Sequence, residues 1–381
     1  MITPRPFISF FGKKIPSFTV FGILGFTVSL ITTFYLTIFL QLSLLIWLTI
    51  TTIGIATFFS LAELMNRIKG SPVLVYYHHE FAIVLLITCF LLFAEPYHVL
   101  QYLDITTTGL GIFLVFGRIG CFMAGCCHGK PSCYGIHYHR EHAEMGFPYY
   151  YLESKLFPVQ LIEASMVFLI VIVMILFLLL RVQPGTAFAF YILCYGVLRF
   201  LLEFARGDIS RPYYGPLSEA QWFSAGLSVL VLTLALIGWI PGFIWHVAII
   251  ALFCFALAFL FLMRKSHRPW FQIKHYHIRE LAILLNELDH RNSKSVRLKI
   301  GKNTIMVTGG ILEEENCRIK HFTVSMYPHV EVCWLDCIGN MIYSLQNCSG
   351  TFIKLNKSVS MKQFIIKSQK KVFLPNVIEE D

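Results

Sequence analysis

Three groups of ionisable residues lie within apolar stretches of this sequence, where they could carry out chemistry. They are His78-His79-Glu80, Arg118, and Arg199 with Glu203 and Arg206. Charged groups at membrane depth are costly and usually face a cavity, a charged partner or a ligand. Guanidinium groups bind phosphate oxygens in a bidentate fork, and imidazole titrates near neutral pH. Several arginines with few carboxylates therefore predict a polar site that holds a phosphate-bearing substrate.

Each group also has a purely structural interpretation. Arg118 follows an apolar stretch and stands among closely spaced glycines, so it could snorkel beside a helix-packing seam. Arg199 and Glu203 are four residues apart, a spacing that suits an internal ion pair on one helical face. A single histidine is more often satisfied structurally than catalytic. Two histidines and a glutamate together on one span favour a functional role.

A second kind of chemistry is suggested by a segment dense in cysteine and histidine. Its members are Cys121, Cys126, Cys127, His128, Cys133, His137, His139 and His142. Thiolates and imidazoles at this density could bind zinc, with Cys121, Cys126, Cys127 and His128 as the candidate ligands, or could form a redox pair. The spacing matches no standard zinc module. A metal-binding or thiol-redox protein is therefore one alternative function.

The composition indicates a polytopic membrane protein. The chain has 381 residues, of which 56% are hydrophobic and only 14% charged, whereas soluble domains have about 25% charged residues. The net charge of +9 does not indicate nucleic-acid binding. Much of it lies in the last third of the chain and beside the apolar segments, where basic residues face cytoplasm or lipid phosphate.

The hydropathy pattern predicts an all-α polytopic membrane protein with about seven to eight transmembrane helices. The predicted spans are about 18–40, 42–64, 73–94, 105–120, 159–180, 187–204, 222–240 and 243–263. A transmembrane domain, residues 1–263, would precede a small mixed α/β soluble domain, residues 264–381. In the second domain we expect an amphipathic helix at 278–288, a hairpin from 296–300 and 304–307, and strands at 322–326, 330–335 and 352–355.

Four sequence blocks resemble the prolipoprotein diacylglyceryl transferase family of bacterial inner-membrane enzymes. Segment 117–122, Gly-Arg-Ile-Gly-Cys-Phe, resembles the family's Gly-Arg-Leu/Ile-Gly-Asn-Phe core, with Asp104 before it and Gly129 after it. Segment 158–163 is similar to its Pro-x-Gln-Leu-x-Glu. Segments 199–206 and 217–224 are similar to its Arg-Phe-x-x-Glu-Phe-x-Arg and Leu-Ser-x-x-Gln-x-x-Ser. The resemblance covers roughly residues 16–240.

The resemblance implies transfer of a diacylglyceryl group from phosphatidylglycerol to a cysteine thiol in the lipobox of a prolipoprotein, or a related lipid-group transfer. No cofactor is implied, and the location would be the bacterial inner membrane, in contact with membrane lipids. His78 stands at the separation from Arg118 that the family's essential histidine shows, with His79 as the other candidate base. The expected catalytic residues are His78, His79, Arg118 and Arg199. The expected substrate-binding residues are Arg206, Glu203, Gly120, Gly129, Cys121 and Gln160.

The sequence also departs from the family pattern. In the family, small residues follow the histidine, whereas this sequence has His79-Glu80-Phe81 after His78. Cys121 stands where the family motif has asparagine, and Cys126 stands where it has glutamate. A catalytically silent, lipid-binding relative is a second alternative function. Basic residues between the predicted spans gather on one side, which the positive-inside rule places in the cytoplasm, whereas the family's site faces outward.

Overall fold

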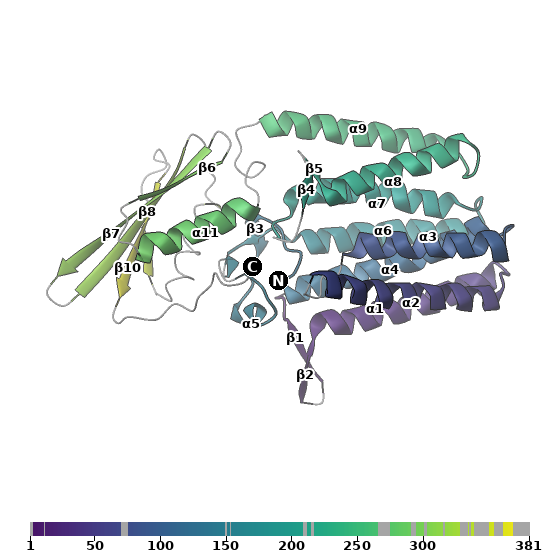
Figure 1. Ribbon diagram of the computed structural model, residues 1–381, viewed down its shortest axis with the longest axis horizontal. Coiled ribbons are helices and arrows are strands. Elements are labelled where there is room, and N and C mark those ends of the chain that lie inside the picture. Colours follow the sequence, from purple (N-terminus) through teal and green to yellow (C-terminus); the bar gives the residue numbers. More distant parts are fainter. Residues whose placement is uncertain are drawn as a thin grey trace.

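The computed structural model shows a helical bundle with a strand-rich unit at one end (Figure 1). The structure describes residues 3–368 except 11, 70–74, 149–150, 153, 209–211, 215–216, 266–274, 291–294, 301–302, 315–316, 328–333, 335–336, 339–349 and 354–360.

Seven of the described helices are long and apolar enough to cross a membrane. They are α1 (Ser17–Phe39), α2 (Leu44–Lys69), α3 (Tyr76–Ala94), α4 (Val99–Ala124), α6 (Val159–Leu179), α7 (Thr186–Leu202) and α8 (Glu219–Leu236). A further helix, α9 (Ile244–Lys265), includes the shorter apolar stretch Ile244–Phe255. The predicted polytopic membrane fold is confirmed. The fourth span begins at Val99 instead of near residue 105, and it continues through the glycine-rich motif as helix.

Helix α4 is the centre of the bundle. It packs against α1, α3, α6 and α7, and 67% of the residues in its most apolar 18-residue stretch are buried. The contact with α1 depends on small residues, because a β-carbon on Gly25 would lie 2.6 Å from Cβ of Phe116. The glycines thus allow two backbones to approach closely. This packing fixes the position of Arg118 on the buried face of α4.

Asp104, in the first half of α4, holds the start of α7. Its two carboxylate oxygens accept hydrogen bonds from the backbone N–H groups of Gly185 and Phe188, each at 2.7 Å. These N–H groups belong to the first turn of a helix, where no intrahelical acceptor is available. Asp104 therefore orients α7, the helix that carries Arg199.

The helices alternate in direction, so the polar ends of α3, α4, α6, α7 and α8 gather at one end of the bundle (Figure 1). Short elements join them there. These are β3 (Pro131–Ile136), α5 (Arg140–Ala143), the 3-10 helix η2 (Glu203–Ala205), and the strands β4 (Tyr213–Tyr214) and β5 (Leu217–Ser218). The predicted long polar connection at 130–157 is thus partly ordered into β3 and α5.

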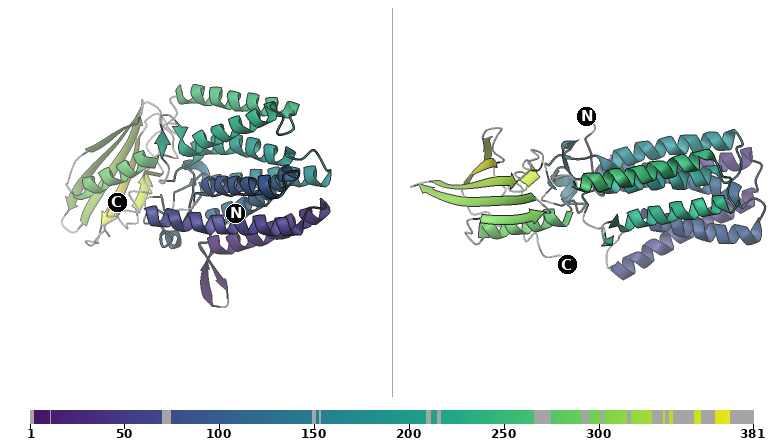
Figure 2. Two further views of the ribbon diagram at one scale, coloured as in Figure 1. Left: turned by 45° about the vertical axis from the view of Figure 1, so that its right-hand side comes forward. Right: turned by 90° about the horizontal axis from the view of Figure 1, so that it is seen from above.

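The strand-rich unit lies beyond the same end of the bundle (Figure 2). It combines α11 (His275–His290) with an antiparallel sheet in the order β6-β7-β8-β10-β9. The strands are β6 (Ser295–Ile300), β7 (Asn303–Glu314), β8 (Cys317–Tyr327), β9 (Gly350–Ile353) and β10 (Met361–Ser368). The predicted amphipathic helix, the first hairpin and the strand at 322–326 are confirmed, and β9 overlaps the strand predicted at 352–355. The strand predicted at 330–335 lies outside the described residues except for Trp334, which is helical.

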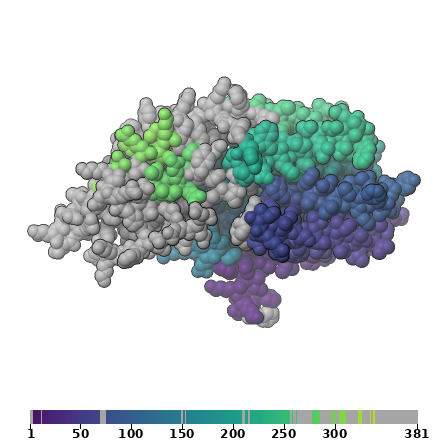
Figure 3. Space-filling view, viewed as in Figure 1, coloured from purple at the N-terminus to yellow at the C-terminus, as the bar shows by residue number. Residues whose placement is uncertain are grey.

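The N-terminal segment forms a hairpin of β1 (Phe7–Phe10) and β2 (Lys13–Pro16). It projects from the side of the bundle near the same end (Figure 3). The N-terminal hairpin, the polar helix ends and the strand-rich unit are therefore all on one side of the predicted membrane spans.

Candidate active site

A buried carboxylate joins two of the arginines. The Glu163 side chain, on α6, is 0% exposed, and its Oε2 lies 3.0 Å from Nε of Arg118 and 3.8 Å from Nη1 of Arg206. Its other oxygen, Oε1, accepts a hydrogen bond of 3.0 Å from the hydroxyl of Tyr195. The arginine side chains are 8% and 1% exposed. Three segments distant in sequence thus converge on one charged group.

The other ion pairs in this cluster are local in sequence. Nη1 of Arg199 lies 2.7 Å from Oε2 of Glu203, four residues later, and both side chains are buried. Arg206 donates from Nε and Nη2 to the two carboxylate oxygens of Asp208, at 2.8 and 3.2 Å. Each of the three arginines therefore has a carboxylate partner. The expectation that few carboxylates accompany these arginines is therefore wrong. Buried guanidinium groups are stabilised by nearby carboxylates, because an unpaired buried charge is costly.

The histidine-histidine-glutamate triplet at the start of α3 points in three directions. Nε2 of His78 lies 2.7 Å from Oε1 of Glu219 on α8, and both side chains are about one-third exposed. Nδ1 of His79 donates to the backbone carbonyl of Val75 at 2.9 Å, and its ring packs on Phe58. Glu80 is buried, and Arg118 and Tyr191 contribute to its electrostatic environment. His78 is therefore the triplet's solvent-reachable base, and Glu80 belongs to the arginine cluster.

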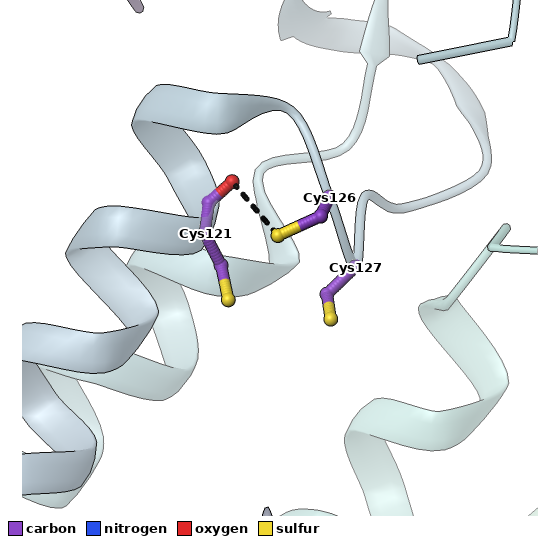
Figure 4. Close-up of side chains that lie close together, drawn as sticks. All are labelled: Cys121, Cys126 and Cys127. Atoms are coloured by element: carbon purple, nitrogen blue, oxygen red, sulfur yellow. Dashed lines mark hydrogen bonds between the residues drawn. The ribbon is translucent and has the colours of Figure 1, made fainter. Parts of the chain in front are cut away.

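Three cysteines gather where α4 ends. The helix ends at Gly125, which adopts the left-handed conformation with φ 83°, and Cys127 also has a positive φ of 56°. This backbone path turns the chain back over the last helical turn, so that the Cys126 thiol points toward the carbonyl of Cys121 (Figure 4). The three Sγ atoms lie within 4.8 Å of one another.

The electrostatic environment of this turn favours a thiolate. The pKa of Cys127 is well below its usual value, because the neighbouring thiols of Cys121 and Cys126 and the positive charges of Arg206 and Arg118 stabilise its charged form. The predicted fourth ligand, His128, lies apart from this group. Its Nδ1 contacts the carbonyl of Gly129 at 3.0 Å, and its ring packs against aromatic residues. The structure thus brings together three of the four predicted metal ligands.

The remaining predicted substrate-binding residues hold the site's backbone in place. A β-carbon on Gly129 would lie 2.3 Å from the carbonyl oxygen of Phe157, and Gly129 pairs with Arg206 in an isolated β-bridge. A β-carbon on Gly120 would lie 3.2 Å from Cα of Phe18 on α1. Gln160 donates from Nε2 to the carbonyl of Cys126 at 2.9 Å. These contacts place the arginine cluster beside the cysteine turn.

An apolar cleft of about 200 Å³ lies between α3, α7 and α8. Its polar lining is concentrated near the site, at Glu80, Tyr195 and Arg199. The rest of the wall is mainly aliphatic and aromatic, and it extends along the helices as far as Leu234 and Ile240. An amphiphile with one charged group and long apolar chains matches this distribution of polarity.

Sequence reasoning missed several residues that complete the site. Glu163 and Glu219 fall inside two of the family-like segments, 158–163 and 217–224, without a role of their own, and Asp208 and Tyr195 fall outside all four segments. Glu163 carries a detectable signal, because a carboxylate within an apolar span is unusual. The pairing of Glu219 with His78 has no local signal, since 141 residues separate them.

Comparisons with known proteins find similarity to one family in the central part of the chain. The family model for prolipoprotein diacylglyceryl transferase matches residues 79–239. A phosphatidylglycerol–prolipoprotein diacylglyceryl transferase of Clostridium tetani is 33% identical over 130 residues, which are 34% of this chain and 50% of the relative. The transferase named 2 of Clostridium perfringens is 31% identical over 133 residues, 34% of this chain and 49% of the relative. The aligned region thus spans about half the length of these relatives.

Proposed function

We propose, from the match of residues 79–239 to the prolipoprotein diacylglyceryl transferase family model, that this protein transfers a diacylglyceryl group from phosphatidylglycerol to a cysteine thiol of a prolipoprotein. The thiol sulfur attacks the glyceryl carbon that bears the phosphate, a thioether forms, and glycerol phosphate leaves. The acceptor would be a lipobox peptide, and the location the bacterial inner membrane. The transferase unit would be residues 1–263, with residues 264–381 as an added soluble domain.

The observation that carries this proposal is the position of a buried arginine cluster at the polar end of an apolar cleft. Phosphatidylglycerol has a phosphodiester between two acyl chains and a glycerol headgroup. In the cleft its chains would lie along α3, α7 and α8, with the phosphate toward Arg199. A pocket with this polarity binds such a lipid by apolar burial and orients it by a few charged contacts.

The arginines suit the leaving group because phosphate gains negative charge as the carbon–oxygen bond breaks. Guanidinium presents five N–H donors, so an arginine paired with one carboxylate retains donors for a phosphate. Arg118 and Arg206 flank one buried carboxylate, Glu163, and are held in fixed positions by it. Preorganised donors of this kind lower the barrier by stabilising charge that develops only in the transition state.

His78 is the base that we propose for the acceptor thiol. Its Nε2 contacts a carboxylate oxygen of Glu219 at 2.7 Å, and a carboxylate partner fixes the orientation of the imidazole ring. His79 is the second choice, because its ring is buried and its Nδ1 is engaged by the backbone. The two histidines thus differ in exposure, and substituting each one singly can distinguish their roles.

The test uses purified protein in phosphatidylglycerol liposomes with a lipobox peptide, and mass spectrometry to detect a diacylglyceryl adduct on the peptide cysteine. We expect an adduct that is lost in Arg118→Ala and retained in Arg67→Ala, which removes an exposed arginine at the end of α2. His78→Ala should then lower the rate more than His79→Ala. No adduct from folded protein, under conditions where a relative from the family is active, would refute the assignment. Bound phospholipid without turnover would then support a silent lipid-binding relative.

A further inference from the structure

The three thiols at the end of α4 have the arrangement of metal ligands. Cys121 is buried, Cys127 is partly buried and Cys126 is exposed, so the group runs from the protein interior to the surface. The Sγ atoms lie within 4.8 Å of one another, although the chain must reverse direction through two left-handed residues to bring them together. Among the described cysteines, histidines and acidic residues, these three are the candidate metal group.

The geometry suits zinc. A zinc–sulfur bond of about 2.3 Å at tetrahedral angles places sulfur atoms about 3.8 Å apart. Sulfur atoms already within 4.8 Å reach that separation through shifts of about 1 Å or less, which side-chain rotations can supply. Soft thiolate ligands select zinc over magnesium or calcium.

The charge of such a site also suits its surroundings. Three thiolates and Zn²⁺ carry a net charge of −1. Arg118 and Arg206 both interact electrostatically with Cys127, so the excess negative charge would lie beside two cations. A disulfide would use only two of the thiols, whereas a metal ion would use all three that the structure brings together.

We propose that Cys121, Cys126 and Cys127 bind one Zn²⁺ as thiolates and leave its fourth position open for the thiol of the acceptor substrate. This inference rests on the transferase function proposed above. Structural zinc sites are closed by four protein ligands, whereas catalytic sites keep one position for water or substrate. The exposed Cys126 marks the side from which a peptide thiol can approach.

The reaction then balances without any change in oxidation state. The acceptor thiol binds zinc as a thiolate and its proton passes to the general base. The thiolate sulfur forms a bond to the glyceryl carbon, and the bond from that carbon to the phosphate oxygen breaks. The electron pair leaves with glycerol phosphate, whose new charge faces the arginines. The proposal also gives a physical reason why cysteines occupy positions 121 and 126, where the family pattern has asparagine and glutamate.

The first experiment measures metal in the full-length protein purified in detergent from zinc-supplemented cells. We expect about one zinc per chain, and its loss in each of Cys121→Ser, Cys126→Ser and Cys127→Ser. Cys133→Ser is the matched control, because Cys133 is an exposed cysteine on the neighbouring β3. Zinc retained by the three variants, or lost equally in the control, overturns the site. A disulfide between any two of the three cysteines, found by mass spectrometry in the unreduced protein, also overturns it.

A second measurement tests the open position without mutating the site. Zinc is removed by a chelator and replaced by Co²⁺, whose thiolate charge-transfer absorption reports the number of sulfur ligands. A lipobox peptide with its cysteine should increase this absorption, and the same peptide with serine should not. An unchanged spectrum with both peptides overturns the substrate role of the metal.

The transferase assay, run on chelated and zinc-restored protein, separates the two proposals. Transfer that is lost on chelation and returns with zinc supports both. Bound zinc and a peptide-dependent cobalt spectrum without lipid transfer support the metal site and contradict the transferase function. Full transfer by protein that contains no zinc supports the transferase function and overturns the metal proposal.

Discussion

The Arg118–Glu163 pair gives the sharpest test of how the site is held together. Glu163→Gln preserves the shape of the side chain and the acceptor for Tyr195 but removes the negative charge between two buried arginines. Arg118→Ala instead leaves Glu163 with Arg206 and Tyr195. We therefore expect the glutamine variant to be the less stable of the two.

The magnitude follows from the geometry. Unit charges 3.0 Å apart attract by about 5.5 kcal/mol at an effective dielectric constant of about 20. Removing one partner of a buried pair typically costs about 3–5 kcal/mol, because the remaining charge stays desolvated. We expect Glu163→Gln to lower the free energy of unfolding by about 4 kcal/mol and Arg118→Ala by about 3 kcal/mol. In the double variant the cost should fall short of the sum by about 2 kcal/mol, since no unpaired partner remains.

The assay is reversible unfolding in mixed micelles, followed by tryptophan fluorescence, for the wild type, both single variants and the double variant. Arg67→Ala is the control, because the exposed Arg67–Glu63 pair on α2 should contribute less than about 0.5 kcal/mol. Additive losses in the double variant would refute a direct buried pair. A glutamine variant as stable as the wild type would show that Glu163 does not neutralise the arginines.

Three further predictions concern the supports of the site. Gly129→Ala should reduce both stability and transfer, by about 2 kcal/mol or more in unfolding free energy, because its β-carbon would lie 2.3 Å from the carbonyl oxygen of Phe157; normal thermal unfolding would contradict this. Asp104→Ala should lower the free energy of chemical unfolding by about 3 kcal/mol, since the backbone N–H groups of Gly185 and Phe188 lose a charged acceptor. Burial lowers the pKa of His142 from its usual 6.5, so the unfolded chain binds a proton that the folded chain excludes. Its contribution to stability should be complete above pH 6.5 and lost as pH falls below it, and His142→Asn should flatten that part of the unfolding profile.

The fold could largely be predicted from the sequence because its signals are local. Twenty or so consecutive apolar residues identify a span without any knowledge of its neighbours. The error at α4 has a physical reason. Its first turns contain Gln101 and Asp104, which lower the local hydropathy, but Asp104 is satisfied by the start of α7 and remains helical.

The site could be predicted only in part, because its pairings are distant in sequence. The local spacing of Arg199 and Glu203 correctly indicated an ion pair at i and i+4. The pairing of Arg118 with Glu163 and of His78 with Glu219 depends on how whole helices pack, and no spacing rule reports it. The same holds for the cysteines, whose convergence depends on the left-handed conformation of Cys127, which favours glycine and is seldom adopted by other residues.

The strand-rich unit lies outside the matched region, yet it contacts the segment that supports the cysteine turn. Gln160 donates to the carbonyl of Cys126 and also to the hydroxyl of Tyr138, at 3.3 Å. Tyr138 is buried in an apolar cluster that includes Trp334 and Ile338 from the C-terminal unit. The C-terminal unit thus belongs to the same buried cluster as Tyr138, whose hydroxyl accepts from Gln160, and Gln160 also holds the backbone between the thiols. These contacts and the cleft's polar residues thus lie at the same end of the bundle as the C-terminal unit.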